Sequence, residues 1–324
     1  MRLAMAEAEV GDDVLDGDPT TRRLEERVAE ILGVEDALFF PSGSQANLTG
    51  IALGTEHGTE LIIEANGHIL HYEMAGTAGL LGVQLRPVQT PDGRLSADLV
   101  RGALRPSSPH LPRVTAVTVE NTHNLAGGKV TDPGRLDGIV AVAREAGLAL
   151  HLDGARLWNA AAALGIAPAR LVRGFDTVMV SFSKGLGCPV GSCLGFRRER
   201  RDRAREIRKR LGGGMRQSGV LAAAGLFALQ HHLPEIPRDH DHARLLAERL
   251  AGCAAVQVEQ PESNIVMIDL TGERNDIQVV NQRLQASGVL VGQYGPRRLR
   301  AVTHRDVDRT QIERAAEVFR MVLA

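Results

Sequence analysis

The feature that most constrains the fold is a regular alternation of short apolar runs with amphipathic stretches. The apolar runs lie at 37–40, 60–65, 113–121, 148–156, 176–184 and 191–196. Helix-type patterns separate several of them, notably at 135–146 and 158–164. Strands that are apolar throughout and alternate with helices form mainly parallel sheets that are covered on both faces. The sequence therefore predicts an α/β fold around such a sheet.

The end of the chain has a different pattern and predicts a second, smaller unit. Pro234 and Pro237 follow an apolar helix-type stretch at 220–229 and are expected to break the chain there. Helix-type stretches at 241–250, 279–286 and 309–323 then flank a strand-like run near 265–270. We therefore predict a large α/β domain over residues 1–235 and a small α+β domain over residues 236–324.

Composition and charge exclude several classes of protein. With 44% hydrophobic and 24% charged residues, the 324-residue chain has the composition of a globular protein. No run approaches the roughly 20 apolar residues of a membrane helix, and the amino terminus lacks a secretory signal. A net charge of −1 indicates no nucleic-acid partner. Three cysteines without disulfide or metal-ligand spacing favour a reducing, cytoplasmic location.

Any chemistry that needs a primary amine has only three candidates, because the chain contains three lysines. Lys129 lies in a glycine-rich loop and Lys209 on a charged helix-type stretch, where solvated side chains are expected. Lys184 instead ends an apolar run, between the small residues Ser183 and Gly185. Burying an unpaired ammonium is costly, so we interpret Lys184 as a functional amine with room beside it for a planar ring.

Asp153 ends the apolar run that precedes the one leading to Lys184. A single aspartate at a strand end is more often a cap or turn residue, but ligands of open α/β sheets gather beyond the carboxyl ends of the strands. An amine and an acid at such ends suit pyridoxal phosphate (PLP), whose protonated ring nitrogen is stabilised by a carboxylate. We therefore predict that Lys184 holds PLP as a Schiff base and that Asp153 faces the ring nitrogen.

A phosphate site is predicted where Gly43 and Ser44 open a helix after Pro41, because backbone N–H groups at a helix start bind anions. The signal is weak alone, since many such turns only cap helices. Ser181 and Ser183 add hydroxyl donors.

Two histidines follow strand-like runs and are candidates for stacking on a cofactor or for acting as a base, His68 and His123. An isolated histidine is more often structural. The run Asp239-His240-Asp241-His242 resembles a metal-binding sequence, but we interpret it as a solvated helix start and predict no metal site.

Taken together, the motifs closely resemble the low-specificity L-threonine aldolases, PLP enzymes of fold type I. The matching strings are MAEAEVGDDV, PSGSQAN, EANGHILHYE, ENTHN, HLDGAR, SFSKGLGCPVGS, LGGGMRQSGVLAAAG and VTHRDV, which cover nearly the whole chain. The resemblance implies a PLP-dependent transferase fold with a seven-stranded sheet. It also implies an aldehyde-lyase that cleaves β-hydroxy amino acids, for threonine breakdown or glycine supply. Members are homotetramers with sites between paired subunits.

The resemblance also implies roles for single residues. Lys184 forms the Schiff base, Asp153 pairs with the ring nitrogen, and His68 stacks on the ring. Gly43 and Ser44, with Ser181 or Ser183, hold the phosphate. The remaining implied roles fall on four residues: Arg156 near the cofactor or the substrate carboxylate, Arg300 on that carboxylate, His123 facing the substrate hydroxyl, and Arg216 at a cofactor site near the subunit boundary.

The sequence departs from the family pattern at two places. Family chains carry an earlier Arg-Ser-Asp-Thr segment, whose serine lies near the substrate carboxylate, and a tyrosine where this chain has Leu15. Two alternatives therefore stay open. One is another fold-type-I PLP reaction, such as β-elimination, desulfurisation or transamination. The other is a PLP-binding protein inactivated by loss of that segment.

Overall fold

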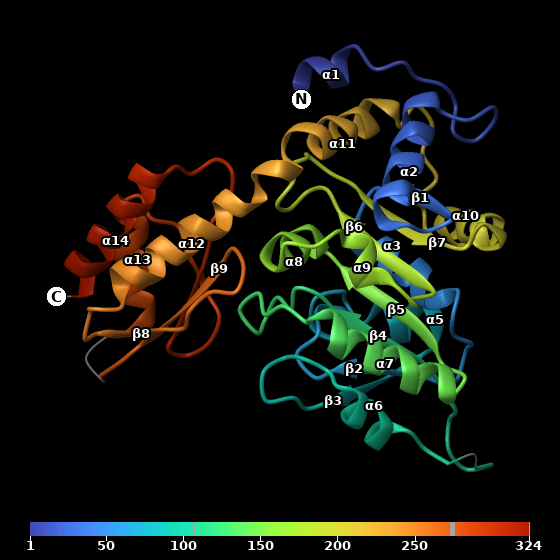
Figure 1. The fold of residues 1–324 in the computed structure, drawn as a ribbon, viewed down its shortest axis with the longest axis horizontal. Helices are drawn as coiled ribbons and strands as arrows, with labels where there is room; N and C mark the ends of the chain where they lie inside the picture. Colours follow the sequence, from blue (N-terminus) through green and yellow to red (C-terminus); the bar gives the residue numbers. More distant parts are fainter. Residues whose placement is uncertain (107, 273–275, 324) are drawn as a thin grey trace.

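The computed structural model describes residues 1–106, 108–272 and 276–323, which build two β-sheets (Figure 1). The larger sheet has seven strands in the order β1-β7-β6-β5-β4-β2-β3. Strands β3, β2, β4, β5 and β6 are parallel, whereas β7 runs antiparallel to both of its neighbours. The strand bounds are β1 Asp36–Phe40, β2 Glu60–Glu64, β3 Gln84–Val88, β4 Val114–Glu120, β5 Ala149–Gly154, β6 Thr177–Ser181 and β7 Ser192–Phe196. The predicted seven-stranded, mostly parallel sheet is thus confirmed.

Helices cover both faces of this sheet because its strands are apolar on both faces. In β1, Ala37 and Phe39 belong to one apolar cluster, whereas Leu38 and Phe40 belong to another on the opposite face. Side chains of α2, α7, α8 and α11 complete the first cluster, and Ala46 of α3 the second. The helix bounds are α1 Arg2–Ala6, α2 Pro19–Leu32, α3 Gly43–Ala52, α4 His68–His71, α5 Gly76–Leu81, α6 Ala97–Ala103, α7 Pro133–Glu145, α8 Leu157–Leu164, α9 Pro168–Val172, η1 Arg198–Arg200, α10 Arg201–Arg210 and α11 Gly219–His231.

The smaller sheet is antiparallel, in the order β10-β11-β9-β8, and has its own apolar core. Helices α12, α13 and α14 pack around it, and in Figure 1 they form the orange and red part of the molecule. The bounds are η2 Leu233–Glu235, α12 Ile236–Leu250, β8 Val256–Val258, β9 Ile265–Leu270, α13 Ile277–Ala286, β10 Gly292–Gln293, β11 Arg298–Val302 and α14 Arg309–Leu323. The division of the chain into domains at residue 235 stays a prediction.

Two expectations for this region need correction. Pro237 does not break the chain, because it lies in the first turn of α12, where a helix needs no N–H donor. The run at 239–242 is not a solvated helix start either. Asp239, His240 and His242 are buried, and His240 Nε2 lies 3.1 Å from the side-chain amide of Asn159 on α8. Burial lowers the pKa of His240 to about 4, so this ring is neutral at physiological pH.

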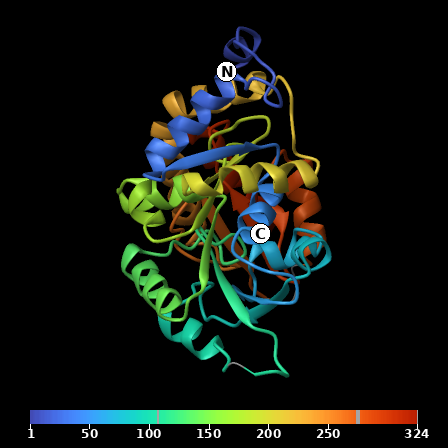
Figure 2. The same ribbon diagram turned by 90° about the vertical axis from the view of Figure 1, so that its right-hand side faces the viewer.

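The two views together place the amino terminus. Helix α1 packs on α11 at one end of the molecule (Figures 1 and 2). Within the described residues, none of the helices combines the length and the apolar character that crossing a bilayer requires.

Candidate active site

Charged side chains stand at the carboxyl ends of four neighbouring strands of the large sheet. Glu64 ends β2 and Glu120 ends β4, while Asp153 lies one residue before the end of β5 and is the register partner of Glu120. Lys184 follows β6 by three residues. Ligands of open α/β sheets bind at this edge. The structure therefore brings Asp153 and Lys184, the two residues on which the PLP prediction depends most, to the same edge of the sheet.

The loop that carries Lys184 is fixed by its neighbours. The Phe182 side chain is fully buried, and its N–H donates to the Gly191 carbonyl at 3.0 Å. Although the Lys184 side chain reaches solvent, desolvation and the Arg156 guanidinium lower the pKa of its ammonium, against the opposing effect of Asp153. A lowered pKa increases the share of free amine, the form that condenses with an aldehyde.

Asp153 is a buried carboxyl with an unusual affinity for its proton. It is 1% exposed and accepts hydrogen bonds from the Ala155 N–H (3.1 Å) and from the Asn47 side-chain amide (3.0 Å). Burial raises the pKa of Asp153 to about 7, and the carboxylates of Glu120 and Glu73 act in the same direction. Such a group is strongly stabilised by a cationic donor, which a protonated pyridine nitrogen provides.

His68 lies between two carboxylates at the start of α4. Its backbone N–H donates to Glu120 Oε2 at 2.8 Å, and its ring Nδ1 lies 3.2 Å from Glu73 Oε1. The hydrogen bond to Glu73 raises the pKa of His68 against the effect of desolvation. One ring nitrogen of His68 and one carboxylate oxygen each of Glu73 and Asp153 all lie within 4.8 Å of one another. The predicted pair of His68 and Asp153 is therefore one cluster, which Glu73 completes.

The buried His123 ring is held in position by hydrogen bonds at both of its nitrogens. It is fully buried, its Nε2 lies 2.9 Å from Glu64 Oε2, and its Nδ1 accepts a hydrogen bond from the Ala126 N–H at 3.2 Å. Desolvation lowers the pKa of His123, but Glu120 and Glu64 outweigh it and the net shift is upward. Both ring nitrogens are thus already engaged. The predicted contact of His123 with a substrate hydroxyl would require one of these bonds to break.

Two arginines that are far apart in the sequence meet at one asparagine. Arg156, just before α8, and Arg300 of β11 both donate to the Asn124 side-chain oxygen, at 2.9 and 2.6 Å. Burial, together with the nearby Arg300 charge, lowers the pKa of Arg156 to about 10. The Arg300 guanidinium also stacks on the Tyr294 ring, 3.9 Å from its centroid. Two guanidiniums that share a single neutral acceptor form a site for an anion such as a carboxylate.

The expected phosphate site also has suitable donors. Gly43 begins α3, and the Ser181 and Ser183 hydroxyls lie 3.3 Å apart. Ser192, the register partner of Ser181 on β7, has a buried hydroxyl for which the described residues offer no hydrogen-bond partner. It lies 3.5 Å from the position that a Cβ on Gly43 would take. A helix start beside an unpartnered hydroxyl fits a phosphate. Ser44 lies in the first turn of the same helix.

Arg216 is not brought to this cluster. Its guanidinium is exposed and donates to Asp12 at 2.7 Å, and its carbonyl accepts from the Asp13 N–H at 3.1 Å. Within one chain it therefore contacts the amino-terminal loop and none of the residues around Lys184.

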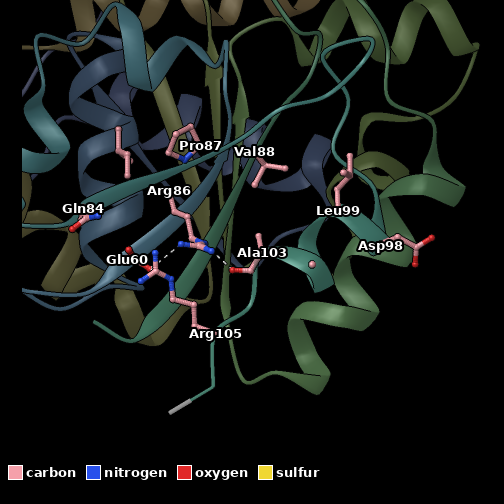
Figure 3. A pocket seen from close by; sticks show the side chains of 11 residues that line it. Glu60, Gln84, Arg86, Pro87, Val88, Asp98, Leu99, Ala103 and Arg105 are labelled. Carbon is pink, nitrogen blue, oxygen red and sulfur yellow. Dashed lines mark hydrogen bonds and ion pairs between the residues drawn. The ribbon is translucent and has the colours of Figure 1, made fainter. Parts of the chain in front are cut away.

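A separate open cavity of about 550 Å³ lies away from this edge (Figure 3). Glu60 begins β2 there, at the opposite end of the strand from Glu64. Its fully buried carboxylate lies 3.8 Å from Arg86 and 3.4 Å from Arg105, and Arg86 also donates to the Ala103 carbonyl at 2.8 Å. The two arginines neutralise a buried charge, which is a structural role.

The sequence analysis missed the polar residues that connect the predicted ones. These are Asn47, Glu73, Asn124, Ser192 and Tyr294. Four of them stand inside the quoted motifs PSGSQAN, EANGHILHYE, ENTHN and SFSKGLGCPVGS, which is the one signal that singles them out: Asn47, Glu73, Asn124 and Ser192. Nothing in the local pattern around Tyr294 indicates its stacking on an arginine of the next strand.

Comparisons with known proteins agree with this fold. A family described as beta-eliminating lyase matches residues 1–273. The low-specificity L-threonine aldolase 1 of Arabidopsis thaliana is 38% identical over 330 residues, which cover 100% of this chain and 92% of that protein. The low specificity L-threonine aldolase of Escherichia coli (strain K12) is 39% identical over 325 residues, covering 100% and 95%.

Among solved structures, a putative aromatic amino acid beta-eliminating lyase/threonine aldolase from Exiguobacterium sp. 255-15 matches with a TM-score of 0.85. The match covers 99% of this chain and 93% of that chain at 22% identity. The fold is therefore that of the PLP-dependent transferases, which is an α/β fold. The chain belongs to the beta-eliminating lyase family.

The arginine pair leads to a first prediction. Arg300→Lys should raise the KM for an amino acid substrate about 10- to 100-fold. The planar arginine guanidinium offers several N–H donors and stacks on an aromatic ring, whereas a lysine ammonium is a single point charge. PLP binding should remain, since Arg300 belongs to the anion site and not to the Lys184 loop. Steady-state kinetics and the cofactor absorbance measure the two effects separately. Arg298→Lys, two residues earlier and paired with Asp269, is the matched control. An unchanged KM for Arg300→Lys would contradict the assignment.

Proposed function

We propose that this protein is a PLP-dependent aldolase that cleaves L-threonine and L-allo-threonine to glycine and acetaldehyde. The observation that carries the proposal is the convergence at one sheet edge of an amine with a lowered pKa, a buried carboxyl and a pair of arginines. The names of the relatives that are 38% and 39% identical support the choice of reaction within the family.

The residues present fit PLP. Lys184 would bind its aldehyde carbon, Asp153 would accept the hydrogen bond of its ring nitrogen, and the start of α3 with Ser181, Ser183 and Ser192 would hold its phosphate. His68 would lie against its ring. When bound, PLP supplies an electron sink for the electrons of the Cα–Cβ bond that breaks.

Arg156 and Arg300 would hold the substrate carboxylate between them in place of the Asn124 oxygen. Two guanidiniums fix both the position and the rotation of a carboxylate, because their paired N–H groups match its two oxygens. The rotation matters because it would decide which bond at Cα is aligned for cleavage. The arginines thus position the bond that is cleaved.

A base must take the proton of the β-hydroxyl as the Cα–Cβ bond breaks and the aldehyde leaves; a proton then returns to Cα and glycine is released. Of the two candidate histidines, we favour His68, acting directly or through a water. Its Nδ1 faces Glu73, and within the described residues its Nε2 has no hydrogen-bond partner. Both nitrogens of His123 are engaged, which favours a role for His123 in holding Glu64 and the loop after β4.

A product assay tests the reaction. Purified protein with PLP should convert L-threonine to glycine and acetaldehyde in equal amounts, with serine and alanine as comparison substrates. Pyruvate from serine would instead indicate β-elimination, and pyruvate from alanine transamination. A PLP spectrum without turnover of any of the three would identify an inactive binding protein.

We further propose a homotetramer located in the cytoplasm. Two exposed apolar residues support burial against a second copy: Met74, next to Glu73, is 95% exposed, and Leu15, in the amino-terminal loop, is 73% exposed. Arg216, which is exposed and paired with Asp12 of its own chain, would contribute to a partner's site. Light scattering of the purified chain gives the assembly, and a monomer would contradict this part of the proposal.

A further inference from the structure

We propose that Glu73 is a positioning residue that sets the orientation and basicity of His68, and that an Asn47–His151 pair buried beneath it holds Glu73 beside Asp153. The inference rests on the proposed function only in assigning His68 to proton transfer. The contacts themselves belong to the described chain.

The orientation of the Asn47 amide follows from its neighbours. Its nitrogen lies 2.9 Å from Glu73 Oε1 and 3.0 Å from Asp153 Oδ2, while its oxygen lies 3.0 Å from His151 Nε2. Both carboxylates need donors, so the NH₂ group must face them and the amide oxygen must face the histidine. Asn47 is 1% exposed, so water does not replace these bonds.

This orientation in turn fixes the proton on His151. The Asn47 oxygen can only accept, so Nε2 of His151 carries the hydrogen and Nδ1 of the neutral ring can only accept. The Thr177 hydroxyl has two acceptors within reach, Nδ1 at 2.9 Å and the Gly50 carbonyl at 3.4 Å, and its hydrogen is assigned to the nearer Nδ1. Burial lowers the pKa of His151 to about 3, which keeps the ring neutral over the whole physiological range. Hydrogen bonds therefore run in one direction, from Thr177 through His151 and Asn47 to the two carboxylates.

Glu73 reaches this network from a strained turn. The two residues after it, Met74 and Ala75, have φ angles of 52° and 55°, in the left-handed region that non-glycine residues rarely adopt. The Gly76 N–H closes the turn on the Glu73 carbonyl at 2.9 Å. A strained turn persists only where its surroundings determine it, and here it directs a buried carboxylate at His68.

Three carboxylates face His68, and Glu73 differs from the other two. Glu120 from β4 bonds to the His68 backbone and Asp153 from β5 acts through its charge, whereas Glu73 alone accepts a hydrogen bond from the ring. The remaining ring neighbour is Tyr72, stacked at 5.4 Å between centroids. A carboxylate on Nδ1 fixes the ring plane and leaves Nε2 as the basic nitrogen, and it also makes that nitrogen more basic.

Glu73→Gln tests the proposal, because it keeps the shape and the acceptor oxygen but removes the charge. We expect the His68 pKa to fall by about one unit or more, since an adjacent opposite charge typically contributes that much. NMR titration of isotope-labelled histidine in the full chain, with and without PLP, measures it; His68→Asn assigns the signal. The acidic limb of the kcat/KM profile for threonine should move to lower pH by the same amount.

Glu206→Gln, an exposed glutamate on α10, is the matched control and should leave both readouts unchanged. An unchanged or raised His68 pKa in Glu73→Gln would overturn the proposal. Should that variant not fold, the wild-type chain decides: His68 must titrate above its ordinary range, and His151 must stay neutral with its proton on Nε2 down to pH 5.

These titrations separate the inference from the function on which it rests. A wild-type chain that shows the His68 shift but no turnover of threonine would contradict the aldolase and leave the network standing. Turnover of threonine without any effect of Glu73→Gln on the His68 pKa would support the aldolase and contradict the role proposed for Glu73.

Discussion

Lys184→Ala should lower threonine turnover on the order of 10⁴- to 10⁶-fold, the loss that follows removal of a covalently acting group. The same change should remove the absorbance band of lysine-bound PLP, because the remaining lysines, Lys129 and Lys209, lie elsewhere. Lys129 contacts Glu259 and Glu262 at 3.4 Å, and Lys209 is exposed on α10. Borohydride reduction followed by peptide mass spectrometry should therefore place the cofactor on Lys184.

Lys209→Ala is the matched control for this experiment and should keep both the band and the turnover. Reduction that places the cofactor on Lys129 or Lys209, or normal turnover by Lys184→Ala, would contradict the assignment of the site.

Asp153→Asn has the second largest expected effect. The substitution keeps the size of the side chain but removes the charge that would hold the PLP ring nitrogen protonated, so kcat should fall by at least about 10²-fold. PLP should still attach to Lys184, which separates this variant from Lys184→Ala in the absorbance spectrum. A variant with normal kcat would show that no charge is needed at this position.

The raised pKa of Asp153 has a consequence for stability that can be measured without substrate. Because the folded chain holds this proton up to about pH 7 whereas the unfolded chain releases it near 3.8, stability is full at low pH and is lost as the pH rises through 7. For the PLP-free chain the loss should be on the order of 3 kcal/mol between pH 5 and pH 8. Urea unfolding at the two pH values measures it. Asp153→Asn should remove that part of the difference, and an identical pH dependence in the variant would contradict the raised pKa.

Most of the large sheet is readable from the sequence because its strands are buried on both faces. The runs at 60–65, 113–121 and 176–184 contain β2, β4 and β6, all of which end within a few residues of the predicted positions. Strand β3 was missed because it is an edge strand with an arginine and a proline, and none of its residues is buried. In the small sheet, β11 was also missed, because it alternates arginines with buried apolar residues over only five positions.

The site residues also fall into two groups, those that the local sequence indicates and those that it does not. Lys184 is predictable as a candidate because it ends an apolar run, where an unpaired ammonium is costly to bury. Asp153 becomes a candidate only together with Lys184, because a single aspartate at a strand end is more often a cap or turn residue. Glu73 and Asn47 acquire their roles from contacts across 26 and 106 residues of chain, to each other and to Asp153. Local patterns do not contain such contacts. The buried Asp239 and His240 were misjudged for a related reason, because the neighbour that covers His240, α8, is about 80 residues away in sequence.

The Asn124 oxygen is bound by Arg156, which precedes α8, and by Arg300 of β11, so carboxylate recognition would depend on how these two parts of the chain are positioned. An α-amino acid would satisfy both guanidiniums at once and hold the four-stranded sheet against the seven-stranded one. A simple amine could also react at the cofactor that Lys184 would hold, but it has no carboxylate for Arg300 to bind. Selection for amino acids over amines would then come from the shared position of the two guanidiniums.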